Sequence, residues 1–379
     1  MPGSDVITVC LTGPASHRLV MDPGRGSCVI GQGPDADLTV APDARLDWSA
    51  FDHLDTPAGS PWPRWFTYHG DDAGFVAWAQ RRPIEGFDWY PSRAHDVDAG
   101  AALIGNLLIC VPDAPLRLVL PETGLAELGL SGHLEHFAAA GRPPRSLALA
   151  VRTSADRCAP PAVPAGVPGL EGVEALRIVH RPLGQPVSLT MLRAFPSLRS
   201  VSLRGGFTDF DVLAEFPRLT SIELRFVPRI EGLPPLASFP ELTRFIGWNI
   251  IDVPGKALRS ELRRLGQVRE LRHASVSQLR SAEWFEHEYG LPYSGWRAPL
   301  AKRAVTAHRT SQAALRACAT AQEAERVLSE FVDGFNGMDG IETAEREDLA
   351  VAVVQLVTQV GTLISPQRAL AVFDEVREF

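Results

Sequence analysis

The chain has 379 residues, of which 45% are hydrophobic and 22% are charged, and its formal net charge is −8. This composition is typical of a globular protein and excludes a largely disordered or collagen-like chain. Residues 1–115 contain 15 acidic and 7 basic residues, so the remainder, with 30 of each, is neutral. Because no part of the chain forms a basic domain, we do not expect nucleic acid as a main partner.

Residues 1–115 are rich in Asp, Gly and Pro and contain five of the eight tryptophans. Short apolar runs separated by Gly and Pro predict strands, and a helix is predicted over 72–81. The predicted strands are residues 6–11, 17–21, 28–30, 38–40, 103–111 and 116–120. We interpret this part as a small, acidic α+β domain that caps the structure that follows.

Internal repeats occupy residues 116–275. Three segments, 195–203, 216–224 and 239–247, align without gaps at offsets of 21 and 23 residues. Each begins with Phe-Pro, and a leucine stands three residues before each Phe. Alternation such as Val201-x-Leu203 predicts a short strand whose every second side chain points inward. Weaker copies precede at 125–130, 144–149 and 173–178, and Val268-x-x-Leu271 is a candidate closing copy.

This pattern resembles the leucine-rich-repeat family, whose L-x-x-L-x-L core recurs at periods of about 20–29 residues. The resemblance implies stacked coils whose strands form a continuous parallel sheet, with each Phe in the core and each Pro fixing the backbone. The family's Asn or Cys, three residues after the last leucine, is replaced here by Gly206, Val227 and Ile250. Without that amide ladder, we expect an irregular solenoid.

The last part of the chain has helical periodicity. Pro299 suits the first turn of a helix over 300–319, and Thr320-x-x-Glu323 is a capping box that opens a helix over 321–335. Acidic residues precede a helix over 349–360, and Ser365-Pro366 begins a final helix. These four segments predict a small helical bundle, joined to the repeats by a linker at 290–296.

The predicted fold is therefore α/β with three domains. These are an acidic, Trp-rich α+β cap (1–115), an irregular leucine-rich-repeat solenoid (116–280) and a helical bundle (295–379). The five cysteines are scattered and form no CxxC pair, and no apolar stretch is long enough to span a bilayer. We expect a cytoplasmic, bacterial protein that does not use a membrane.

The best candidates for chemistry lie in the N-terminal part. His53, His69, Asp71 and Asp72 could hold a metal or act in acid–base catalysis, but their spacing matches no known ligand pattern. Asp71-Asp72 equally predicts a helix cap. The surrounding tryptophans predict either a small core or a platform for a carbohydrate or peptide. We expect no cofactor, no metal and no catalytic residue, with an enzyme site at these His and Asp residues as the alternative.

The outward face of the repeat sheet is the more specific candidate. The register predicts that Arg204, Arg225 and Trp248 form one column of side chains. Arginine and tryptophan are enriched in interface hot spots, and the sheet face of a solenoid is its usual binding surface. The alternative is that this face has no binding role and is a solvated surface of Arg–Glu pairs. The predicted partner-binding residues are Arg177, Arg204, Glu223, Arg225, Arg244 and Trp248.

The sequence thus predicts a non-enzymatic protein that binds another protein or a peptide, with a preference for acidic patches. An immunity-type inhibitor of a specific toxin or enzyme is a second form of the same binding role. The sequence does not distinguish between these partners.

Overall fold

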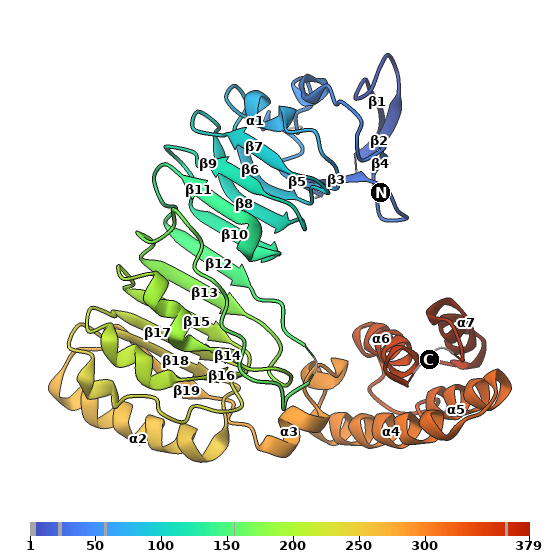
Figure 1. The fold of residues 1–379 in the computed structure, drawn as a ribbon. Helices are drawn as coiled ribbons and strands as arrows, with labels where there is room; N and C mark the ends of the chain where they lie inside the picture. Colours follow the sequence, from blue (N-terminus) through green and yellow to red (C-terminus); the bar gives the residue numbers. More distant parts are fainter. Residues whose placement is uncertain (1–4, 22–24, 57–58, 155, 361–362) are drawn as a thin grey trace. The chain divides into compact units, whose positions relative to one another are not determined.

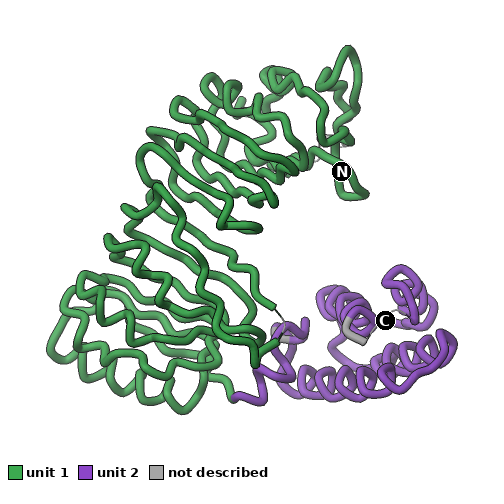
Figure 2. The backbone as a smooth tube through the Cα atoms, in the orientation of Figure 1, with its two compact units in different colours: residues 1–281 green, residues 282–379 purple. Residues whose placement is uncertain are grey.

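The computed structural model describes residues 5–21, 25–56, 59–154, 156–360 and 363–379. The chain divides into two compact units, residues 1–281 and residues 282–379 (Figure 2). The first unit is α/β and is built on a large parallel sheet, and the second is helical (Figure 1).

The main sheet of the first unit is open and has twelve strands, with β4 and β19 at its edges. All neighbouring strands are parallel, and from β5 to β19 the order in the sheet follows the order in the chain (Figure 1). In sheet order the strands are β4 (Leu38–Thr39), β3 (Ser27–Gly31), β5 (Trp65–Tyr68), β6 (Ile84–Trp89), β8 (Ile104–Val111), β10 (Glu127–Gly132), β12 (Ser146–Ala150), β13 (Ala175–Val179), β15 (Ser200–Arg204), β17 (Ser221–Arg225), β18 (Arg244–Trp248) and β19 (His273–Ser277).

Alternation in the sequence explains these strands. In β15, Val201 and Leu203 are buried while the residues between and after them are not. Parallel pairing in register places Val201 beside Ile222 of β17, and the same pairing continues to β18. Each strand therefore buries its inward side chains against equivalent side chains of its neighbours, which a single coil cannot do alone.

The predicted domain boundary at residue 115 falls inside this sheet. β8 pairs with β6 on one side and with β10 on the other, so the sheet continues across the boundary without a break. The sheet begins at β3 and β4, well before residue 116. A separate α+β cap was expected because residues 1–115 are rich in Asp, Gly, Pro and Trp, yet strand pairing requires only matched alternation.

We call the chain between two sheet strands a return segment. Three early return segments contain the strands β7 (His95–Asp98), β9 (Leu116–Val119) and β11 (Phe137–Ala140), which form a second parallel sheet. Later ones contain the short paired strands β14 (Val187–Ser188) and β16 (Phe207–Thr208) and the 3-10 helices η3 (Leu189–Ala194), η4 (Phe210–Glu215) and η5 (Leu236–Ser238). The last return segment contains the helix α2 (Asp252–Val268).

The repeated Phe residues occupy the expected place. Phe195, Phe216 and Phe239 are buried, and each backbone N–H donates to the carbonyl of the leucine three residues earlier. The candidate closing copy at Val268 is wrong, however. Val268 is the exposed last residue of α2, and the last strand, β19, begins only at His273. Leu271 lies between α2 and β19 and packs against the core, so the two residues belong to different parts of the return segment.

The beginning of the first unit contains the hairpin β1 (Asp5–Val9) with β2 (His17–Met21), the 3-10 helix η1 (Trp48–Phe51) and the short helix α1 (Gly74–Trp78). Another 3-10 helix, η2 (Leu134–His136), precedes β11. Of the five early tryptophans, Trp48, Trp62, Trp78 and Trp89 are buried in the core. Trp65 is instead 37% exposed.

The second unit consists of α3 (Ala282–His287), the 3-10 helix η6 (Pro292–Gly295) and four longer helices. These are α4 (Ala298–Ala317), α5 (Ala321–Asp333), α6 (Thr343–Val360) and α7 (Pro366–Val376). The Thr320 and Glu323 capping box is present at the start of α5, as predicted. Among the described residues, no helix is both long and apolar enough to cross a membrane.

The prediction of a linker at 290–296 is wrong. Tyr293 and Trp296 are buried in the core of the helical unit. The Tyr293 hydroxyl lies 3.0 Å from His308 Nδ1, and the Trp296 indole donates to Asp348 at 2.8 Å. Tyr293 and Trp296 are large aromatic side chains whose burial makes this segment part of the unit.

Candidate functional site

The outward face of the main sheet has three columns of side chains, fixed by the strand register. From β13 to β18, the first column contains Ala175, Ser200, Ser221 and Arg244, and the second contains Arg177, Ser202, Glu223 and Ile246. The third column contains Val179, Arg204, Arg225 and Trp248. The predicted column of Arg204, Arg225 and Trp248 is therefore present, and all six predicted binding residues lie on this one face.

Two arginines of the third column stack on aromatic rings. The Arg204 guanidinium lies 4.8 Å from the centre of the Phe226 ring, and that of Arg225 lies 5.6 Å from the centre of the Trp248 ring. The two rings meet edge to face, with centroids 4.8 Å apart and planes at 89°. At these distances each guanidinium is attracted to the π-system of its ring, a cation–π contact that limits the motion of the side chain.

The ion pairs on the face are unevenly distributed. Glu223 pairs with Arg225 and lies 3.7 Å from Arg244, and Arg177 pairs with Glu127 of β10. These contacts are of the kind expected for a solvated face without a binding role, and they neutralise the charge on part of the face. In the described part of the chain, Arg204 has no carboxylate partner, and its side chain is exposed. Arg204 is therefore the arginine of the column best placed to receive an external anion.

Sequence reasoning missed Phe226. It follows the last residue of β17 with φ of 52°, and its N–H donates to the Trp248 carbonyl at 3.0 Å. Gly205 and Asn249 stand at the equivalent positions after β15 and β18, also with positive φ. Gly and Asn commonly adopt this left-handed conformation, whereas a bulky aromatic residue rarely does. The only available signal was that mismatch at an aligned position.

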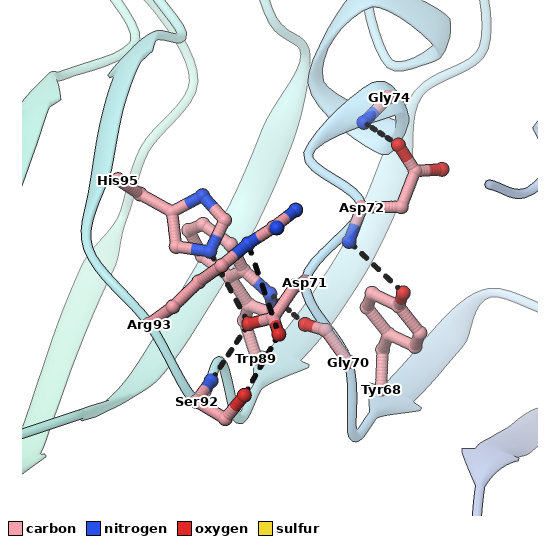
Figure 3. Close-up of polar contacts among 9 residues, drawn as sticks. All are labelled: Tyr68, Gly70, Asp71, Asp72, Gly74, Trp89, Ser92, Arg93 and His95. Carbon is pink, nitrogen blue, oxygen red and sulfur yellow. Dashed lines mark hydrogen bonds and ion pairs between the residues drawn. The ribbon is translucent and has the colours of Figure 1, made fainter. Parts of the chain in front are cut away.

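The rival His/Asp site does not assemble. Asp71 is buried and accepts hydrogen bonds from the Ser92 N–H and hydroxyl, both at 2.7 Å (Figure 3). His95 Nε2 lies 3.4 Å and Arg93 Nε 3.8 Å from the same carboxylate (Figure 3). Burial raises the pKa of Asp71, but these contacts, led by those from Ser92, reverse that effect and hold it below the usual value. Asp71 thus ties the segment after β5 to the segment after β6.

Asp72 and the histidines have separate environments. Asp72 accepts from the N–H of Leu46 and the indole of Trp48. It also accepts from the N–H of Gly74, and its own N–H donates to the Tyr68 hydroxyl (Figure 3). His69 stacks on Tyr90, and His53 is exposed. Asp72 accepts from the N–H of the first residue of α1, but the N-cap itself is Ala73, which makes no side-chain cap. The expected cap at Asp71-Asp72 is therefore met only in part, by Asp72. Within the described ranges, no group of three or more His, Cys, Asp or Glu side chains is arranged to hold a metal.

Comparisons of the chain with protein-family models, with curated proteins and with solved structures found no match. The function must therefore be inferred from the geometry of the sheet face and from the chemistry of its side chains.

Proposed function

We propose that this chain is an irregular leucine-rich-repeat protein that binds another protein or a peptide through the outward face of its sheet. The in-register pairing of the repeats at 21- and 23-residue offsets supports the assignment to this class. Sheet faces of such stacked repeats are extended surfaces suited to a partner, and this face concentrates arginine and aromatic side chains.

The observation that carries the proposal is the Arg204–Phe226–Trp248–Arg225 cluster. It combines exposed guanidinium groups with aromatic rings that are already ordered by contact with one another. Ordered aromatic and arginine side chains lose little conformational entropy on binding, and a flat guanidinium accepts a carboxylate in a bidentate geometry. The partner that fits this cluster presents Asp or Glu side chains beside an apolar group.

The test compares the wild type with Arg225→Glu/Trp248→Ala and with Arg204→Ala. We expect the double variant to abolish capture of the partner from cells of the source organism, and Arg204→Ala to weaken it at least tenfold. Arg193→Ala is the matched control, because Arg193 lies on η3, is exposed and pairs with Glu215 away from the sheet face. Normal capture by the double variant, with an unchanged melting temperature, would exclude this face as the binding site.

A further inference from the structure

The opposite end of the same face carries side chains of different chemistry. Continuing the three columns toward β5 gives Asn106, Gly86 and Trp65 in the first, Leu108, Asp88 and Thr67 in the second, and Cys110, Tyr90 and His69 in the third. At these positions the only carboxylate is Asp88, and none of the residues is Lys or Arg. This end of the face is aromatic and carries a single carboxylate, whereas β15–β18 are rich in arginine.

Trp65 forms an open aromatic platform at this end. A Cβ atom at position 86 would overlap the Trp65 ring, so the indole lies directly over the Gly86 backbone of the neighbouring strand. Despite this contact the residue remains 37% exposed, so part of the indole is open to solvent. Only glycine at position 86 allows this arrangement, because a side chain there would push the Trp65 ring away from the sheet.

Asp88 places a negative charge beside that platform. It is half-buried, and one of its carboxylate oxygens is enclosed without a hydrogen-bond donor among the described residues. Burial raises the pKa of Asp88, and an interaction with the Trp65 indole opposes the rise. The carboxylate is therefore poorly solvated, and a nearby cation would stabilise its ionised form.

The third column at this end of the face contains a pair of stacked rings. His69 and Tyr90 stack at a centroid distance of 4.4 Å and an angle of 18°. Between the two ends, on β10, β12 and β13, most outward residues are small, namely Gly129, Ser131, Ser146, Ala148, Ala150 and Ala175. The Arg177–Glu127 ion pair interrupts this stretch on one side. Small side chains allow the backbone of a bound segment to approach the sheet closely.

We propose that the β5–β6–β8 end of the face is a second subsite, which binds a Lys or Arg side chain of the partner on the exposed ring of Trp65, beside Asp88. This inference rests on the proposed function, because the same partner segment would place its carboxylates at Arg204. Five strand spacings separate Asp88 of β6 from Arg204 of β15, about 24 Å at ~4.8 Å each. An extended segment of about seven residues spans this distance. The partner is thus a bipolar, extended protein segment.

The first experiment follows the indole N–H signals of the 15N-labelled full chain during titration with N-acetyl-arginine amide. Trp65→Phe and Trp248→Phe assign the two relevant signals. We expect the arginine probe to shift Trp65 but not Trp248, and N-acetyl-aspartate amide to do the reverse. Asp88→Asn should weaken binding of the arginine probe at least fivefold. The control is Asp43→Asn, because Asp43 is an exposed acid outside these columns.

The outcomes separate the two proposals. If Trp248 responds to the aspartate probe while Trp65 ignores the arginine probe, the cation subsite is refuted and the proposed function stands. A response of Trp65 to a neutral sugar instead of the arginine probe would also refute it, since the platform would then bind carbohydrate. Equal arginine affinity in wild type and Asp88→Asn removes the role of the carboxylate and overturns the proposal.

A second experiment tests the polarity of the segment. A fluorescent peptide with two arginines and two glutamates separated by a seven-residue Gly/Ser spacer is compared with the same peptide carrying citrulline, which is neutral, in place of arginine. We expect wild type to bind the citrulline peptide at least threefold more weakly than the arginine peptide, and Trp65→Ala/Asp88→Asn to bind the two peptides equally. A citrulline effect of the same size in that double variant would place the arginines elsewhere.

Discussion

Two coils of the first unit have the same length but return in different ways. The register pairs Leu107 with Leu128 and Val201 with Ile222, so each coil advances 21 residues from one sheet strand to the next. The first coil returns through the strand β9 and the second through the 3-10 helix η4. Length therefore does not decide the form of the return segment.

The spacing of the buried side chains decides it. In β9 the buried residues are Leu116 and Leu118, two residues apart, as in any strand with one buried face. In η4 and its C-terminal flank they are Phe210, Val212, Leu213 and Phe216. Phe210, Leu213 and Phe216 recur every three residues, which matches the three residues per turn of a 3-10 helix. In α2 the spacing of Leu258, Leu262 and Leu265 is that of an α-helix. The sheet strands that flank β9, η4 and α2 all belong to the same parallel sheet, so the difference lies only in the return segments.

The largest expected effect comes from removing one core leucine from each kind of return segment. Leu118→Ala in β9 and Leu213→Ala in η4 should each lower the free energy of unfolding by about 2–5 kcal/mol, because both side chains are buried and leave a cavity. Denaturant unfolding measures this. Leu103→Ala, at a largely exposed position, serves as the control. A loss below about 1 kcal/mol at Leu213 would mean that the 3-10 segments are not part of the core.

Acid should destabilise the coil between β13 and β15 through His180, which follows β13. Burial lowers the pKa of His180 to about 4, against a smaller opposing effect of the Gly206 backbone. Because the unfolded chain binds the proton near pH 6.5 and the folded chain does not, stability is complete above pH 6.5 and falls as the pH drops toward 4. The loss is up to about 3 kcal/mol.

The measurement is the urea midpoint between pH 4 and 7. His180→Leu should flatten this dependence. His308→Leu offers a counterpart in the helical unit, where burial also lowers the pKa of His308 to about 4. If the urea midpoint changes with pH equally in wild type and in His180→Leu, folding does not lower the pKa of His180.

Two glycines with the same backbone conformation should differ when substituted. Gly124 and Gly169 have φ of 86° and 85°, so alanine costs about 1 kcal/mol at either position from the left-handed backbone alone. At Gly169 the added Cβ would also collide with the Ala139 carbonyl of β11, whereas at Gly124 it meets nothing. We expect Gly169→Ala to be less stable than Gly124→Ala by a further ~1–3 kcal/mol. Equal melting temperatures would mean that β11 yields without cost.

The smallest effect on stability is expected at the surface of the return segments that contain η3 and η4. Arg193 of η3 and Glu215 of η4 form an ion pair at 2.6 Å between neighbouring return segments, and both are well exposed. Exposed pairs of this kind contribute little because solvent screens them. Arg193→Ala should leave the denaturation midpoint within experimental error, at low and at high salt. A clear loss that salt removes would show that these pairs hold the helical coils in register.

Local patterns in the sequence determined much of this protein. The alternation at Val201 and Leu203, the Phe-Pro at 195 and the capping box at Thr320 each act over a few residues, and each has the predicted structure. The outward column of Arg204, Arg225 and Trp248 was also predictable, because side chains alternate between the two faces of a strand and aligned repeats bring equivalent positions together.

Only the tertiary structure decided which distant segments pair. It extended the sheet across residue 115, placed Phe226 between Arg204 and Trp248, and brought Trp65 over Gly86 beside Asp88. It also enclosed Asp71 with Ser92 and His95, which turned a candidate catalytic residue into a structural contact. These outcomes depend on strand register between residues more than twenty positions apart, and a local sequence pattern does not encode that register.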